Sequence, residues 1–258
     1  MSASLLHTAS TVNTFQQLFD VQLADTETLR RRVSQVRYQV FCEELGFAMT
    51  HRDGHEQDDY DASSLHCLIH HRPSAADIGC IRLVLPGPRG GGLPFEKFGV
   101  QHIDRKLLDW RKLDPTRCCE ISRLAVVSAF RRPALVPSLR SATDLNQPHT
   151  LKRLPAVAQA LYQSVIALIL AREFESMFMV GEPRLQRHLA SCGIPMRQIS
   201  PTFEYFGPRA VFVIDNSSLK QAVSEWENER LDLYQLVYQQ MNGAQPLVAD
   251  DDRQSVVA

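Results

Sequence analysis

Glu120-Ile-Ser-Arg-Leu-Ala-Val126 is the stretch of sequence that decides the fold. It predicts a β-strand over 120–127 that is buried on both faces toward its end, because residues 124–127 are all apolar. In a regular strand Glu120 and Ser122 face one side of the sheet and Arg123 faces the other. Charged side chains in an apolar strand cost free energy unless they are paired or take part in chemistry. The stretch is therefore interpreted either as a structural ion pair or as one wall of a reactive site.

Hydrophobic patterning on either side of this strand predicts an α/β order. A helix is expected where apolar residues recur at helical spacing from Leu29 to Val40, and strands where short runs alternate or are wholly apolar. In chain order the expected elements are a helix (25–45), a hairpin of two strands (65–70 and 78–85), the strand at 120–127, a helix (155–174), a strand (177–181), a helix (183–192), a strand (210–214) and a last helix (218–241). This order predicts a single α/β domain with a central mixed sheet and helices on both faces.

The domain is expected to extend over residues 21–242. Residues 1–20 are polar and rich in Ser and Thr, which favours a loose arm. Residues 131–154 are irregular and basic and contain three prolines, so they are interpreted as an insertion. Residues 243–258 are expected to be a disordered tail.

The overall composition excludes several classes of function. The chain has 258 residues and a net charge of −1, so no global attraction to nucleic acid or to an anionic membrane is expected. No apolar run approaches the ~20 residues that cross a bilayer, and the N-terminus lacks the basic start and apolar block of a signal peptide. The six cysteines are therefore expected to be free thiols, and the expected location is cytoplasmic.

Two further polar clusters precede the strand at 120–127. Arg37 and Phe41 lie four residues apart on one helical face, where an arginine can also simply cover an aromatic core residue. The run 56–61 carries four acids, and it is interpreted as a solvated loop or as a site for a cation: a metal, an amine or buried arginines. It lacks the glycine and the distal glutamate of a calcium-binding EF-hand loop. Arg37 and Arg82 are therefore its expected partners, in carboxylate–guanidinium pairs.

Motifs for other chemistries are missing from the sequence. There is no Walker loop, no Gly-x-Ser-x-Gly elbow and no dinucleotide-binding fingerprint. His66 and His70 would share one strand face, but no second ligand pair with zinc spacing accompanies them. We therefore expect no bound cofactor and no metal.

In this order, the motifs resemble those of the acyl-homoserine-lactone (autoinducer) synthases, which have a GNAT-like fold. That family carries Arg-x-x-x-Phe in a helix, then Gly-Trp, Glu-x-Asp-x-Tyr-Asp, Gly-x-x-Arg-Leu and Glu-x-Ser-Arg-Phe-Ala-Val. The matching residues here are Arg37 and Phe41, Gly46 and Phe47, Glu56, Asp58, Tyr60 and Asp61, Gly79, Arg82 and Leu83, and Glu120 to Val126. The resemblance implies a V-shaped opening, which admits a thioester, between the strand at 120–127 and the strand at 177–181.

Three departures point to a neighbouring group of enzymes. Phe47 stands where the synthases have Trp, Leu124 stands where they have Phe, and the chain is longer. In these features it is more similar to N-acyl amino acid synthases, including acyltransferases found beside bacterial PEP-CTERM/exosortase systems. The implied function is transfer of a long-chain fatty acyl group from an acyl carrier protein (ACP) thioester to the amine of a small molecule, an amino acid. The alternatives are an acyl-homoserine-lactone synthase that uses S-adenosylmethionine, an acetyl-CoA N-acetyltransferase, and a non-catalytic module that binds acyl carrier protein.

The resemblance also implies roles for single residues. Glu120 is expected to be the base that takes a proton from the attacking amine. A backbone N–H near Val126 is expected to stabilise the oxyanion. Ser122 and Arg123 complete the expected catalytic set. The expected acceptor pocket consists of Arg37, Phe41, Phe47, Glu56, Asp58, Asp61 and Arg82.

The sequence after Val126 favours acyl carrier protein as the donor. Acetyltransferases of the GNAT type follow this strand with a glycine-rich turn whose N–H groups bind the pyrophosphate of CoA. Here the glycines are absent and Pro133 lacks an N–H. Residues 97–153 hold twelve Lys and Arg against five Asp and Glu, which suits an acidic carrier protein or, equally, a solvated face. The expected carrier contacts are Arg131, Arg132, Lys152 and Arg153.

Overall fold

The computed structural model describes residues 12–87, 92–131 and 155–243. The expected insertion and tail lie almost wholly outside these ranges, and so do Arg132, Lys152 and Arg153. No helix within the described ranges is long and apolar enough to cross a membrane.

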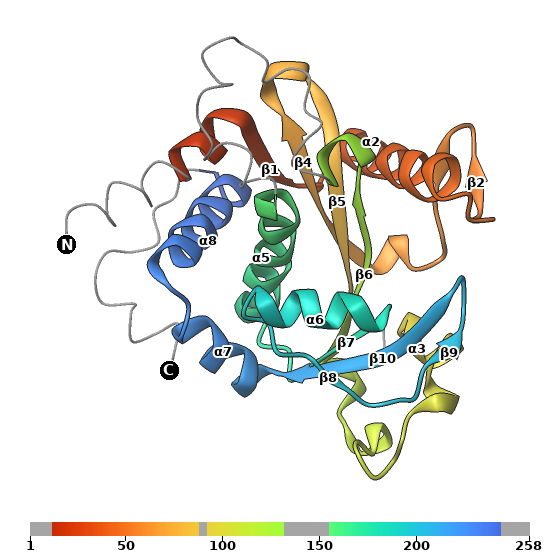
Figure 1. Ribbon diagram of the computed structural model, residues 1–258. Coiled ribbons are helices and arrows are strands. Elements are labelled where there is room, and N and C mark those ends of the chain that lie inside the picture. The colour runs from red at the N-terminus through yellow and green to blue at the C-terminus, as the bar shows by residue number, and fades with distance from the viewer. Residues whose placement is uncertain (1–11, 88–91, 132–154, 244–258) are drawn as a thin grey trace.

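One mixed sheet forms the centre of the molecule (Figure 1). Its strand order is β1-β4-β5-β6-β7-β10-β8, and β9 pairs with β10. The pairs are antiparallel except for β6 and β7, which are parallel. The strands are β1 (Phe19–Leu23), β4 (Ser64–His71), β5 (Ala76–Val84), β6 (Cys118–Val126), β7 (Ser176–Gly181), β8 (Arg197–Gln198), β9 (Phe203–Glu204) and β10 (Pro208–Asp215). A separate hairpin consists of β2 (His51–Arg52) and β3 (His55–Glu56).

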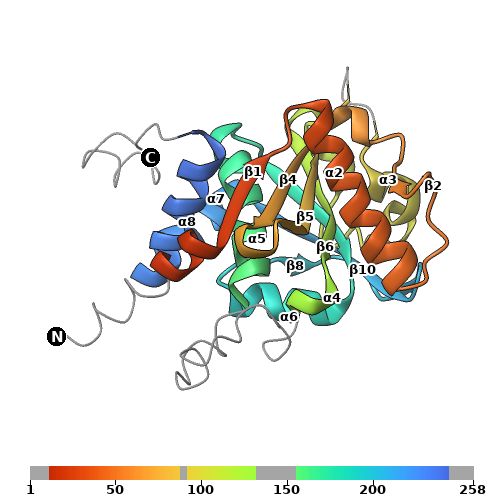
Figure 2. The same cartoon turned by 90° about the horizontal axis from the view of Figure 1, so that it is seen from above.

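Helices cover both faces of this sheet (Figure 2). On one face α2 (Glu27–Arg37) is capped by Thr26 and continues as the π-helical segment η1 (Tyr38–Glu44). Cys80 of β5 points toward α2, because its Sγ lies 4.0 Å from the carbonyl oxygen of Val33. The preceding Gly79 faces α5 (Pro155–Ala171) on the other side, since a Cβ there would lie 3.2 Å from Leu161. The remaining helices are α3 (Pro94–Phe98), α4 (Ser128–Arg131), α6 (Pro183–Ser191), α7 (Asn216–Ser224) and α8 (Asn228–Met241).

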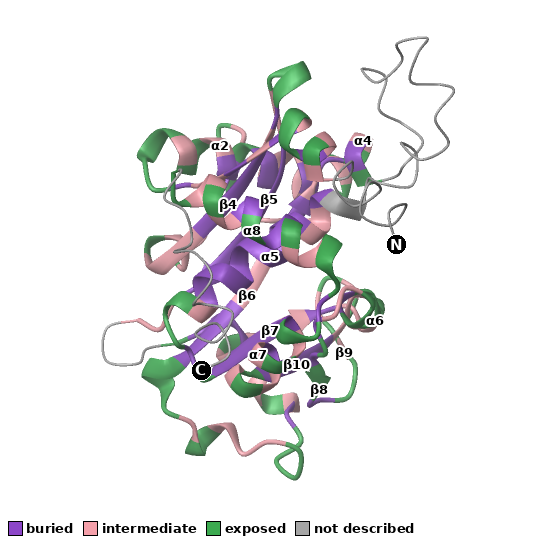
Figure 3. Cartoon of the chain, turned by 90° about the vertical axis from the view of Figure 1, so that its left-hand side faces the viewer, coloured by how far each residue is buried: buried purple, intermediate pink, exposed green. Residues whose placement is uncertain are grey.

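Buried residues follow the central strands and α5 (Figure 3). α5 packs on β4, β5 and β6 with one side and on α8 with another, so its side chains from Val157 to Ile169 are almost all buried. A helix that is apolar around most of its circumference is typical of such an enclosed position. A second apolar cluster, which includes Phe95, Phe178 and Val211, lies under α3. The fold class predicted from the sequence, one mixed α/β domain with helices on both faces, is confirmed.

The expected V lies between β6 and β7. Their parallel pairing runs from Cys118↔Ser176 to Ile121↔Met179 and stops there. β6 continues to Val126 and β7 continues to Gly181 without further pairing with each other, so the two strands separate. This opening lies at the centre of the sheet, where the motif residues of β6 are located.

The N-terminal segment differs from the prediction. Residues 12–18 are helical, and β1 pairs with β4 from Phe19↔His71 to Leu23↔Cys67. Phe15 and Phe19 are buried in the main core. The expectation of a loose arm over 1–20 is therefore wrong for residues 12–20, because these two rings bury apolar area that the polar composition of the segment conceals.

The last predicted helix is in fact two helices. α7 ends at Ser224 and α8 begins at Asn228. Between them Trp226 is buried and its indole N–H donates to the carbonyl oxygen of Gly193 at 3.0 Å. The helix also starts earlier than expected, because Asp215 caps it by accepting from the N–H of Ser218.

Candidate active site

A β-bulge in β6 shapes the site. Ser122 pairs with Arg82 and Ala125 pairs with Cys80, so two residues of β6, Arg123 and Leu124, oppose a single residue of β5. Arg123 has a φ of +51°, in the left-handed region that bulky residues rarely adopt. The bulge overturns the expectation that Arg123 faces away from Ser122. Both side chains reach the same polar cluster.

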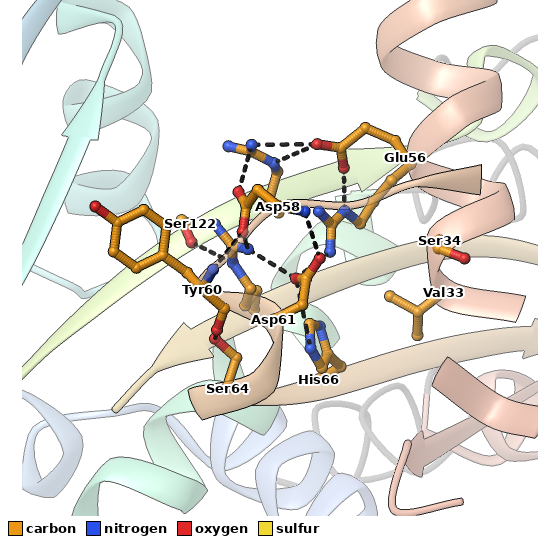
Figure 4. A network of polar contacts seen from close by, with 12 residues as sticks. Val33, Ser34, Glu56, Asp58, Tyr60, Asp61, Ser64, His66 and Ser122 are labelled. Atoms are coloured by element: carbon orange, nitrogen blue, oxygen red, sulfur yellow. Dashed lines mark hydrogen bonds and ion pairs between the residues drawn. The ribbon is translucent and has the colours of Figure 1, made fainter. Parts of the chain in front are cut away.

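That cluster is a network of ion pairs (Figure 4), and several of its members line the cavity described below. Asp61 Oδ1 accepts from Arg37 Nη1 at 2.6 Å and from Arg82 Nη1 at 2.8 Å. Asp58 accepts from Arg82 Nη1 at 2.6 Å and from Arg123 Nη2 at 2.7 Å. The predicted pairing of the acidic run with arginines is confirmed for these two carboxylates.

Glu56 closes the network between α2 and β6. It pairs with the Nε of Arg37, and its other oxygen lies 3.2 Å from the Nε of Arg123. Arg37, Arg82 and Glu56 are each at most 1% exposed. Three carboxylates and three guanidiniums therefore neutralise one another in a place where an unpaired charge would be very costly.

The network holds Asp58 and Asp61 ionised. Burial by itself would raise the pKa values of Asp58 and Asp61, but the guanidiniums of Arg82, Arg123 and Arg37 outweigh it and lower both pKa values. Burial likewise opposes the charge on Arg37, but Glu56 and Asp61 raise its pKa. In the described ranges no group of three or more His, Cys, Asp or Glu lies together as a metal site would require.

His66 lies at the edge of the network and stays neutral. Its Nε2 is 3.8 Å from Asp61 Oδ1. Burial lowers the pKa of His66 to about 4, helped by Arg37 and Arg82 and opposed by Asp61. The imidazole therefore adds no charge to the network at neutral pH.

Glu120 differs from the other acids because it has no ion-pair partner among the described residues. Its side chain is buried, and its Oε2 accepts from the backbone N–H of Phe95 at 2.6 Å. Burial raises the pKa of Glu120 to about 8, against the opposing effects of that hydrogen bond and of Arg82 and Arg123. A carboxyl group with such a pKa can both take and return a proton near neutral pH.

A cavity of about 1240 Å³ connects this carboxyl with the opening between β6 and β7. Its polar part includes Glu120, Ser122 and Arg123. Its apolar part lies between α5, α6 and β7. The apolar residues there include Tyr162, Val165, Ile166, Met179, Leu185, Leu189, Ile194 and Met196.

Val126 lies where the two strands have separated. The N–H of Val127 bonds to the carbonyl oxygen of Ile78 in β5 at 2.8 Å. Successive N–H groups of a strand point to opposite sides, so the N–H of Val126 points away from β5, toward β7. The pairing with β7 has ended by this residue, and Val126 lines the cavity. Its N–H is thus directed into the opening.

Most residues predicted for the site come together. Those that line the cavity are Phe41, Phe47, Glu56, Asp58, Arg82, Glu120, Ser122, Arg123, Val126 and Arg131. Arg37 and Asp61 instead support the wall through the network. The roles assigned to all these residues stay predictions.

Sequence reasoning missed several residues of the site. Phe95 supplies the N–H that holds Glu120, and Tyr205 and Phe206 line the cavity from the turn between β9 and β10. Glu44 accepts from the N–H of Ser128 with both oxygens, at 3.1 Å each, and also pairs with Arg131. A partner that is distant in sequence leaves no local pattern by which it could be found.

Comparisons with known proteins support the fold. Residues 36–140 match the family model described as an acetyltransferase (GNAT) domain. No curated protein matches the chain.

Solved structures extend the comparison to most of the chain. The chain is similar to the AHL synthase LasI, with 18% identity and a TM-score of 0.55 over 79% of this chain and 93% of that one. It is similar to FeeM, an N-acyl amino acid synthase from uncultured soil microbes, with 14% identity and a TM-score of 0.53 over 79% and 94%. It is also similar to BjaI, a CoA-dependent acyl-homoserine lactone synthase, with 17% identity and a TM-score of 0.53 over 80% and 87%. At these identities the likeness establishes the fold. The chain therefore has a GNAT-like fold, with residues 36–140 matching the acetyltransferase (GNAT) domain.

Proposed function

We propose that the chain is an N-acyltransferase that moves a long-chain fatty acyl group from an acyl carrier protein thioester to the amine of a small molecule, an amino acid. The observation that carries the proposal is the cavity that joins an apolar part, an opening between β6 and β7, and the buried carboxyl of Glu120. The apolar part suits an acyl chain, and the opening suits the thioester arm. In this proposal the carboxyl of Glu120 accepts the proton of the attacking amine.

The reaction needs one proton acceptor and one oxyanion donor. The neutral amine attacks the thioester carbonyl and forms a C–N bond, and the carboxylate of Glu120 takes the proton that the nitrogen loses. The N–H of Val126 donates to the oxyanion. The C–S bond then breaks, and the thiol leaves with a proton that Glu120 can return. Arg82 and Arg123 hold Asp58 and Ser122 in place. This scheme uses no bound cofactor or metal.

The surroundings of Ser128 favour acyl carrier protein over CoA. Ser128 begins α4, directly after β6, where a pyrophosphate would need free N–H groups. The carboxylate of Glu44 accepts from this N–H and pairs with Arg131, so an anion of the protein itself already occupies the position. A second anion there would be repelled.

The basic segment 97–153 supports the carrier protein less strongly than its sequence suggests. Among its described arginines, Arg117 pairs with Glu175 and Arg123 pairs with Glu56 and Asp58. The exposed charge that remains includes Arg105, Lys106 and Arg111. Complementary charge of this kind raises the association rate with an acidic partner and is screened by salt.

An amino acid is the proposed acceptor because Phe47 and Leu124, which depart from the autoinducer synthase pattern, both line the cavity. The alternatives are a synthase that uses S-adenosylmethionine and a module that binds acyl carrier protein without catalysis. The link to PEP-CTERM/exosortase systems and the cytoplasmic location stay predictions.

The test uses the purified chain with one long acyl group carried either on acyl carrier protein or on CoA. Each donor is mixed with single amino acids or with S-adenosylmethionine, and mass spectrometry identifies the product. An N-acyl amino acid formed faster from the carrier thioester supports the proposal. A lactone formed only with S-adenosylmethionine would contradict the amino acid as acceptor. Equal use of both thioesters would contradict acyl carrier protein as the preferred donor. The absence of product with every pair would favour the non-catalytic module.

A further inference from the structure

An arc of five aromatic rings follows the wall of the cavity from η1 to α3. In order these rings are Phe41, Phe47, Phe206, Tyr205 and Phe98, with centroid distances of 6.5, 5.7, 5.0 and 4.5 Å between neighbours. All five rings line the cavity. Because they come from η1 and the loop after it, from α3 and from the β9–β10 turn, the arc joins segments that are distant in sequence.

The contact between Phe47 and Phe206 lies where the cavity meets solvent. Phe206 is 43% exposed, and so is Leu45, which also lines the cavity. Phe206 reaches across from the β9–β10 turn to the segment that follows η1. No other ring contact between these two segments is present among the described residues.

The backbone at Phe206 is unfavourable for the residue it carries. Its φ is +50°, and the next residue, Gly207, has a φ of +93°. Gly, Asn and Asp are the residues that adopt this left-handed conformation readily. Because Phe206 is 43% exposed, burial offsets only part of this cost. A strained residue where a cavity meets solvent suggests that the residue has a functional role.

The arc lies at the polar end of the cavity. Its first ring, Phe41, has the guanidinium of Arg123 6.0 Å from its centroid, and its last ring, Phe98, has Lys97 Nζ at 5.3 Å. Burial raises the pKa of Tyr205, and Arg123, Asp58 and Glu120 are near enough to influence it, so this ring of the arc lies beside the polar residues of the cavity. The apolar part is lined by residues of α5, α6 and β7. Closure of the arc therefore acts on the acceptor and not on the acyl tail.

We infer, on the basis of the proposed function, that Phe206 is a positioning residue that packs on Phe47 and closes the acceptor end of the cavity. Closure holds the acceptor amine near Glu120 and keeps water from the thioester. Water is the competing nucleophile: its attack forms a C–O bond, breaks the C–S bond and releases a fatty acid and a thiol. Excluding water from the site favours the amide product.

The test compares Phe206→Asn with Asp53→Asn. Asp53 has a φ of +51°, is exposed and does not line the cavity, so the control places the same residue in the same backbone conformation at another turn. Thiol release and amide formation are measured in parallel while the acceptor is varied. Phe206→Trp, which keeps a ring, is the rescue variant.

We expect Phe206→Asn to raise the acceptor KM roughly 3- to 10-fold, as the loss of one aromatic contact implies, with kcat at saturating acceptor nearly unchanged. The share of thiol released without amide should rise, while the preference for acyl chain length and the melting temperature stay as in the wild type. Phe206→Trp should restore the wild-type ratio, and Asp53→Asn should not change it. A Phe206→Asn variant with the wild-type KM and the wild-type share of hydrolysis overturns the inference.

A second measurement separates this inference from the proposed function. A wild-type chain that forms no amide from any donor counts against the proposed function. Closure is then judged by the rate at which a fluorescent long-chain N-acyl amino acid dissociates from the cavity. Faster dissociation from Phe206→Asn than from Asp53→Asn supports closure, and equal rates overturn it.

Discussion

At the scale of single residues, Glu120 is the group whose chemistry depends most on its position. Its raised pKa of about 8 means that the carboxylate becomes the main form only above neutral pH. We therefore expect the rate of acyl transfer to rise with pH through about 8.

Glu120→Gln should lower the rate of acyl transfer by a factor of about 10²–10⁴, because it keeps the shape and removes the base. The acceptor amine also loses its proton at alkaline pH, so the glutamine variant serves as the reference for that separate effect. Glu43→Gln is the matched control, since it makes the same change at an exposed acid that does not line the cavity. A Glu120→Gln variant with nearly full turnover would show that the base is another group.

The same carboxyl group predicts how stability depends on pH. The pKa of Glu120 is about 8 in the folded protein against an ordinary value of 4.5, so between these values the folded state binds more protons than the unfolded state. The free energy of unfolding should therefore fall as pH rises through this window, by about 1.4 kcal/mol per pH unit from this group.

Glu120→Gln removes this dependence. Its melting temperature should exceed that of the wild type by an amount that grows from pH 5 to pH 8 and then levels off. Calorimetry across this range provides the measurement. A difference in melting temperature that stays constant across this pH range would mean that burial does not raise the pKa of Glu120.

At the scale of elements, the ion-pair network joins α2, the loop before β4, β5 and β6 into one wall. Arg82 is central because it pairs with both Asp58 and Asp61 and is 1% exposed. Arg82→Ala removes one cation from the balanced network and leaves Asp58 and Asp61 with one guanidinium each, so it should lower the free energy of unfolding by about 3–5 kcal/mol. Arg123 has a side chain that is 23% exposed, and Arg123→Ala should cost less because solvent already screens part of its interaction with Glu56 and Asp58.

Chemical denaturation of the two variants checks whether Arg82→Ala loses more free energy of unfolding than Arg123→Ala. Arg123→Ala should retain folding while it slows acyl transfer, since it disturbs Asp58 beside the cavity. Equal losses of stability in the two variants would contradict the difference in burial from which the order is argued.

At the scale of the whole molecule, the placement of charge predicts how the protein distinguishes its donors. With the carrier thioester, kcat/KM should fall as salt rises, because screening slows the association of complementary charges. With the CoA thioester of the same acyl group, kcat/KM should depend less on salt.

Glu44→Gln tests the donor preference within one chain. It removes the negative charge that occupies the N–H of Ser128 and pairs with Arg131, so use of the CoA thioester should increase relative to the carrier thioester. Glu43→Gln, at an exposed neighbouring acid, is the control. An unchanged ratio of the two donors in Glu44→Gln would show that this carboxylate does not exclude the pyrophosphate.

The sequence by itself determined the order of the main helices and strands from α2 to β10, the mixed sheet and the residues gathered at its centre, but it did not reveal β1, α3 or the break between α7 and α8. Helical spacing from Leu29 to Val40, and the apolar runs of β4, β5 and β7, are local patterns that specify an element wherever the chain is placed. The acidic run also implied its arginine partners, because four neighbouring acids require positive charge if they are buried.

The tertiary structure alone decided the geometry of the site. Arg123 reaches the same cluster as Ser122 only because β6 bulges against β5. Glu120 acquires its raised pKa only because α3 and the sheet bury it, which outweighs the opposing effect of the Phe95 N–H. Phe47 and Phe206 meet although 158 positions separate them in the sequence. Bulges, burial and contacts between distant segments arise from the balance of packing over the whole molecule, and no pattern within a single segment contains that information.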